Sequence, residues 1–244
     1  MLKSCGAVVV LTVLTLPVGV VAFAPPAEAD EFIFAIGVKA HYATLTRTLK
    51  VDSDPHRVET PRSDAAWMQG VTFNAAYGHL FFGADYSSSA FIDSEGPLSS
   101  SGVPVFHKDV NLDISELDLA VGYTIVAGVS PYIGYLRHGQ KSDLNCSGCT
   151  ATVELGDIGP GLLLAYPVAR THWGAYVNMA LIQGFSIEGG LSYAGIRWPV
   201  VGVAGFAYRR IDYPVEEVSC QTDFPCFRES DVISGPIVAV HYIF

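Results

Sequence analysis

The chain has 244 residues; half are hydrophobic, only 16% are charged, and the formal net charge is −10. Soluble domains contain ~25% charged residues, and nucleic-acid binders display a basic patch or stripe, so the composition argues against a nucleic-acid partner. Disorder is excluded because apolar and aromatic residues are plentiful. The 24 glycines and 12 tyrosines favour sheets and tight turns over helices.

Residues 1–29 have the pattern of a cleaved secretory signal peptide. Lys3 supplies a positive charge, residues 6–21 are apolar, and Ala27, Glu28 and Ala29 fit an A-x-A cleavage site. Retention as a membrane anchor is the alternative, and the cleavage site argues against it. The sequence therefore predicts export, with residues 30–244 forming one mature domain.

Beyond the signal peptide, apolar residues alternate with small or polar residues, which is the period of a β-strand. Phe34, Ile36 and Val38, for example, alternate with Ala35, Gly37 and Lys39. We expect strands at about 32–49, 65–77, 80–91, 113–124, 130–140, 152–166, 171–182, 186–195, 199–211 and 231–244.

Two features place the apolar face of these strands against lipid. The other face is crowded with Gly, Ala, Ser and Asn, as a narrow interior requires. The strands have ~10 residues or more, enough to cross a bilayer when tilted, whereas ordinary strands average ~5–6. We expect the following residues to point outward: Phe34, Ile36, Val38, Tyr42, Leu119, Val121, Tyr123, Trp173, Val177, Leu191, Tyr193, Val238, Val240 and Tyr242.

Long and short connections alternate along the chain, as in outer-membrane barrels with long outside loops and short periplasmic turns. The long connections are 50–64, 92–112, 141–151 and 212–230, and the connection 183–185 is an unusually short outside one. The sequence predicts an all-β fold, a single antiparallel up-and-down transmembrane β-barrel of about ten strands, with eight as the alternative. The apolar parity changes near Ser115 and Gly159 are interpreted as β-bulges.

The mature chain keeps an even number of cysteines, which in an exported protein indicates disulfides. A zinc site held by four thiolates is the alternative. The cysteines fall in two outside loops that are not neighbours in a ten-strand meander. We therefore predict local disulfides, Cys146 with Cys149 and Cys220 with Cys226, and we expect no metal site and no cofactor.

Charged and polar side chains on the other face are expected to point into the barrel, because Lys or Arg facing lipid would cost ~2–4 kcal/mol at the midplane. Their role is either a packed plug of salt bridges or the lining of a narrow pore. Acidic residues around 212–231 outnumber the single Arg228, so an open pore would prefer cations. The predicted lumen or pore-lining residues are Lys39, His41, Asp85, Glu116, Asp118, Glu154, Asn178, Glu188 and His241, and Asn74, His172 and Tyr176 are also expected inside.

The chain ends with Val238, Val240, Tyr242 and Phe244 on one face. This ending resembles the C-terminal signature of Gram-negative outer-membrane barrels, which implies recognition by the barrel assembly machinery. Residues 116–123 followed by 130–135 resemble a strand–turn–strand of the small outer-membrane barrels that include the OmpA, OmpX and OmpW groups. The resemblance implies integral residence in the outer membrane after export to the periplasm, in contact with lipid and lipopolysaccharide.

Catalytic motifs are missing from the sequence: there is no G-x-S-x-G, no H-E-x-x-H and no Walker loop. The residues that could form an omptin-like protease site at the mouth, Asp212, Glu216, Glu217 and His107, fit better as solvated loop residues. We therefore expect a monomeric, non-enzymatic barrel that is structural, surface-exposed or a narrow cation-preferring pore. A barrel enzyme acting on lipid or peptide at the outer rim and a soluble periplasmic lipocalin-like binder are the alternatives.

Overall fold

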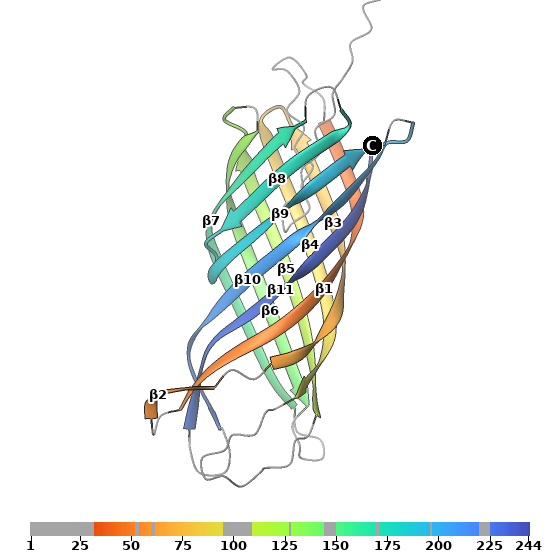
Figure 1. Ribbon diagram of the computed structural model, residues 1–244. Coiled ribbons are helices and arrows are strands. Elements are labelled where there is room, and N and C mark those ends of the chain that lie inside the picture. Colours follow the sequence, from red (N-terminus) through yellow and green to blue (C-terminus); the bar gives the residue numbers. More distant parts are fainter. Residues whose placement is uncertain are drawn as a thin grey trace, which may run out of the picture.

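The computed structural model describes residues 32–51, 54–59, 62–94, 109–126, 128–143, 150–168, 171–195, 197–219 and 225–244. They form one closed antiparallel barrel of ten strands, with a short extra strand, β2 (Asp54–Glu59), that pairs only with β1 (Figure 1). No helix among these residues is long and apolar enough to span a membrane. The barrel strands are β1 (Phe32–Val51), β3 (Arg62–Tyr77), β4 (Leu80–Ser94), β5 (Asp109–Tyr123), β6 (Val129–Asp143), β7 (Thr150–Pro167), β8 (Trp173–Ala180), β9 (Gly184–Ala194), β10 (Val200–Ser219) and β11 (Pro225–Ile243).

The barrel closes by pairing of its first and last strands. Each barrel strand pairs with its neighbour in sequence, and β11 returns to β1 through pairs such as Val38 with Val240 and Ala35 with Ile243. Closure leaves no free sheet edge, which a strand within a bilayer requires. The predicted up-and-down meander is confirmed with ten strands rather than eight.

The short and long connections lie at opposite ends of the barrel. In Figure 1 the C-terminal end of β11 lies at the top, whereas β2 lies at the bottom, at the end of the predicted outside loops. At the C-terminal end, Tyr77 pairs with Leu80 around a tight turn in which Gly78 has φ 56°. At the other end β10 and β11 extend into the predicted loop 212–230, because their ladder continues from Glu216–Arg228 to Ser219–Pro225 after a register shift.

The alternation of the strands separates an apolar outer wall from the barrel interior. Val38 is 61% exposed, whereas Gly37 and Ala35 beside it are buried. All the residues predicted to point outward lie on the outer wall, although Phe34 and Leu119 are half-buried there. Phe34 is covered because its ring stacks on Phe244, with 4.8 Å between the ring centroids.

Aromatic side chains gather at both rims of this wall. Tyr42 and Trp67 pair toward the β2 end, with ring centroids 5.1 Å apart. Trp173 and Tyr193 pair toward the other end, at 4.9 Å. Two aromatic belts on either side of an apolar band are typical of a barrel that spans a bilayer.

The two predicted β-bulges are wrong. The ladders of β5 with β6 and of β6 with β7 run without a register shift through Ser115 and Gly159. The apolar parity changes because Leu112, Ile114 and Leu155 point into the barrel. Near the β2 end the interior is itself apolar, and a period-two pattern cannot distinguish an apolar interior from lipid.

The disulfide prediction remains open to experiment. Cys146, Cys149 and Cys220 lie outside the described residues, and of Cys226 only the backbone, in β11, is described. Peptide mapping of the unreduced protein is expected to recover Cys146 linked to Cys149 and Cys220 linked to Cys226. A peptide that joins one pair to the other would contradict local pairing. Because such short loops close at little entropic cost, reduction is expected to change global stability only slightly.

Candidate functional site

A layer of charged side chains crosses the middle of the barrel. The Lys39 ammonium on β1 lies 2.7 Å from the Asp85 carboxylate on β4, and these side chains are 12% and 1% exposed. Strand β3 lies between β1 and β4, and its Gly70 pairs with Lys39 on one side and with Ser87 on the other. A Cβ atom at position 70 would come within 2.5 Å of the Tyr86 carbonyl, so the backbones pack too closely there for a larger residue.

Arg209 on β10 holds two carboxylates of β5. Its Nη1 donates to Glu116 over 2.9 Å and its Nη2 to Asp118 over 2.8 Å. Glu116 also contacts the ring nitrogen Nδ1 of His138, at 3.1 Å. Because β10 and β5 are not neighbours in the sheet, this bridge crosses the interior of the barrel.

The carboxylates of the charged layer outnumber its cations. Glu188 is 3% exposed and accepts a hydrogen bond from the Tyr176 hydroxyl over 2.9 Å. Lys39 and Arg209 therefore face Asp85, Glu116, Asp118 and Glu188. If all four carboxyls are ionised, their excess of negative charge attracts cations and repels anions.

Further polar groups lie between the charged layer and the C-terminal end of the barrel. His241 Nδ1 lies 3.1 Å from the Thr72 hydroxyl, and Tyr132 donates to Asn178 over 2.9 Å. The Asn74 amide, and His41 Nε2 on the β2 side of Lys39, have no hydrogen-bond partner among the described residues. Buried groups of this kind are ordinarily satisfied by ordered water.

A small cavity lies inside the charged layer. Lys39, His41, Glu116, Glu188 and Arg209 are among its lining residues, and its volume is about 30 Å³. A cavity of that volume can hold only about two water molecules. The cavity is therefore too small to hold a solute.

Apolar side chains close the interior on both sides of the charged layer. Phe91, Leu45 and Ile233, on the β2 side, are each less than 2% exposed although they point into the barrel. A side chain that lines an open channel would be exposed to the water inside it. The outer apolar layer contains Ala43, Leu45, Met68, Phe91, Leu112, Ile114, Ile211, Tyr213 and Ile233, and the inner one contains Ala35, Phe81, Ala120, Tyr132, Leu163, Ala165, Tyr176, Ala180, Ala194, Val201, Val203, Ala239 and Ile243.

A second ion pair lies toward the β2 end. Arg47 Nε donates to Asp231 over 3.2 Å, and the Tyr213 hydroxyl donates to the same carboxylate over 2.8 Å. Asp231 is fully buried, so it does not belong to an acidic cluster at the mouth as the sequence suggested. Asp212 is exposed and pairs with Arg210 at 2.7 Å. His107 and Asp223 lie outside the described residues, as do the side chains of Glu216, Glu217 and Glu229.

The structure places nearly all the predicted interior residues inside the barrel. His172 is an exception, because it is exposed in the connection before β8, where its ring contacts Tyr193. Glu154 is the other exception. Its side chain is 58% exposed on the outer wall, 2.7 Å from Arg137. We predicted an inward Glu154 because we assumed a bulge near Gly159. The strand has no bulge there, and Val153 and Leu155 point inward instead. The predicted residues that point inward are Lys39, His41, Asn74, Asp85, Glu116, Asp118, Tyr176, Asn178, Glu188 and His241.

The sequence analysis did not predict that Arg209 and His138 point into the barrel. For Arg209 the sequence does contain an indication. Arg209 and Arg210 are consecutive in a strand, so their side chains point to opposite faces. One of the two had to enter the interior, but the residues of 199–211 do not alternate clearly enough to show which face of this strand points outward. The structure turns Arg209 inward and leaves Arg210 on the outer wall.

Comparisons with known proteins bear on the fold. No family model and no curated protein matches the chain. The outer membrane protease OmpT of Escherichia coli is 10% identical, with 89% of this chain and 100% of OmpT covered and a TM-score of 0.51. The chain has the fold of an outer-membrane β-barrel. The expected resemblance is thus confirmed for the fold, and the lipid-facing wall agrees with integral residence in the outer membrane.

Two further solved structures align with this outer-membrane barrel at lower TM-scores. Neisserial surface protein A is 15% identical, with 83% of this chain and 96% of that protein covered and a TM-score of 0.33. The Pseudomonas putida toluene transporter TodX is 10% identical, with coverages of 91% and 93% and a TM-score of 0.36. At such identities the likeness says nothing about activity.

Proposed function

We propose that this outer-membrane barrel is a non-enzymatic protein whose membrane-spanning part is a closed scaffold that presents its outer loops at the cell surface. The carrying observation is that inward-facing side chains such as Phe91 and Leu45 are almost completely buried. The Arg209 bridge to Glu116 and Asp118 further obstructs the middle of the barrel. A packed interior favours a structural role over transport.

The arrangement of the acidic and histidine side chains argues against catalysis. The described carboxylate–histidine pair, Glu116 with His138, lies inside the barrel with His138 fully buried. A substrate at the mouth could not reach it. The buried carboxylate nearer the mouth, Asp231, is held by Arg47 and Tyr213. General acid–base chemistry requires a group within hydrogen-bond reach of the substrate, and neither arrangement offers one.

A narrow cation-preferring pore is the second candidate, favoured by the excess of carboxylates in the charged layer. Conduction would require both apolar layers to move aside. The selectivity would follow from the negative layer and would weaken at high salt, because salt screens such fields.

Planar-bilayer recording of the full mature protein tests the two candidates. The closed scaffold predicts no stepwise conductance at low or high salt, while a known porin in the same bilayer gives clear steps. Steps with a cation preference that weakens at high salt would contradict the closed scaffold and support the pore. An anion preference that persists at low salt would contradict both candidates.

A further inference from the structure

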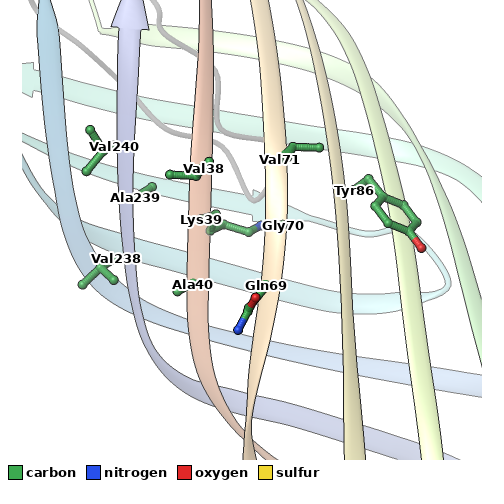
Figure 2. A pocket seen from close by; sticks show the side chains of 10 residues that line it. All are labelled: Val38, Lys39, Ala40, Gln69, Gly70, Val71, Tyr86, Val238, Ala239 and Val240. Carbon is green, nitrogen blue, oxygen red and sulfur yellow. The ribbon is translucent and has the colours of Figure 1, made fainter.

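Two grooves on the outer wall meet at Tyr86. The first runs over β11, β1 and β3 and reaches Tyr86 on β4, with a volume of about 550 Å³ (Figure 2). Val38, Val71 and Val240 line it, and the small side chain of Ala40 leaves it hollow. Three of its lining residues are polar, namely Lys39, Tyr86 and the exposed Gln69. This groove is therefore predominantly apolar.

The second groove runs over β4, β5, β6 and β7 and has a volume of about 520 Å³. Its side chains are mostly polar and carry both signs of charge. Gly139 lies in its floor, where an added Cβ atom would come within 2.8 Å of the Ser115 hydroxyl. Besides Tyr86, its lining includes Ser88, Ser89, Asp113, Ser115, Lys141, Thr152 and Glu154.

The strand register places the grooves at different depths in the membrane. The Val38–Val71 pair lies four residues along β1 from the Tyr42–Trp67 pair, on the side of the membrane interior. From Tyr86 the polar groove runs the other way, through Ser88–Ser115 to Ala90–Asp113, toward the β2 end. The apolar groove thus faces the hydrocarbon of the bilayer, and the polar groove faces the headgroups of the outer leaflet.

We propose that the two grooves together bind one lipid whose headgroup is a phosphorylated saccharide, the chemistry of lipopolysaccharide. An acyl chain lies in the apolar groove, and the saccharide lies in the polar groove. Hydroxyls of Ser88, Ser115 and Thr152 match the hydroxyls of a sugar, and the Lys141 ammonium matches a phosphate. An ordinary phospholipid offers a phosphate but few hydroxyls to this surface.

Arg137 supplies a second cation beside the polar groove. Its side chain is 51% exposed and is held 2.7 Å from Glu154, a residue of the groove. An arginine oriented by a carboxylate keeps donors free for a phosphate. The carboxylates of Asp113 and Glu154 are placed to accept hydrogen bonds from sugar hydroxyls.

Native mass spectrometry of the full mature protein in mild detergent tests this site, with purified lipid A as the probe and phosphatidylglycerol as the competitor. We expect one lipid A per chain, which phosphatidylglycerol does not displace. The Arg137→Ala, Lys141→Ala double variant should bind lipid A roughly tenfold more weakly or worse, because each lost charge-assisted hydrogen bond is costly. Arg210→Ala, which removes an arginine of an exposed ion pair on β10, is the matched control and should bind normally.

A second pair of variants tests the apolar half. Ala40→Phe fills the apolar groove and should lower lipid A occupancy, whereas Ala175→Phe on the exposed wall of β8 should not. Heat-modifiable migration on gels shows separately that each variant is a folded barrel. The proposal would be overturned if phosphatidylglycerol abolished the binding of lipid A to the wild-type protein. It would also be overturned if the groove variants and their controls lost lipid A binding equally.

Discussion

Replacing Arg209 by methionine is expected to destabilise the barrel by about 3–5 kcal/mol, the usual cost of breaking a buried ion pair from one side. Glu116 and Asp118 would remain buried at 7% and 6% exposure without the guanidinium that neutralises them. Lys39 is already bonded to Asp85, so it cannot replace both contacts of Arg209.

Urea unfolding in lipid vesicles, followed by heat-modifiable migration, measures this loss. The matched control is Arg210→Met, because Arg210 belongs to an ion pair of the outer wall that is about half exposed. Exposed pairs contribute about 0–1 kcal/mol. If Arg209→Met unfolds at the same urea concentration as Arg210→Met, the ion bridge across the interior does not stabilise this barrel.

Replacing Val38 by arginine is expected to cost about 2–4 kcal/mol of unfolding free energy, the penalty for a cation on the lipid face near the midplane. Val38 is 61% exposed and lies between the two aromatic belts. In a soluble protein the same exposed substitution would change stability by only about 0.5 kcal/mol. The size of the effect therefore distinguishes lipid from water around this wall.

Thr46→Arg is the control for the lipid-face substitution. Thr46 is on the same strand, beyond Tyr42 toward the β2 end, where the penalty falls to about 0–1 kcal/mol. Equal urea midpoints for Val38→Arg and wild type would contradict a lipid-facing position for Val38.

The strands and their orientation followed from the sequence wherever the interior is polar. Around Val38 and Val240 one face of each strand is apolar and the other is small or polar. The alternation was therefore enough to predict which face points into the barrel. Near Ile114 and Leu155 both faces carry apolar residues, so the alternation could not show which face points inward, and the predicted orientation was wrong. The misplacement of Glu154 is a direct consequence, because its orientation was inferred from those apolar neighbours.

The individual ion pairs could not be predicted. Arg209 and Glu116 are distant in sequence and lie on strands that are not adjacent. Whether their side chains meet depends on the diameter of the closed barrel and on the stagger of its strands. Alternation predicted that Glu116 and Asp118 point inward, but it carries no information about what lies across the interior.

Quenching of the native tryptophans by brominated lipids tests most directly that the apolar wall lies in a bilayer. Trp67, Trp173 and Trp198 are 56%, 49% and 73% exposed, and they lie toward the two rims of the wall. In vesicles, bromines near the headgroups should quench them most, whereas a Val38→Trp probe without the native tryptophans should be quenched most by bromines near the midplane. Insensitivity to every brominated lipid, together with efficient quenching by aqueous iodide, would contradict the membrane-spanning barrel.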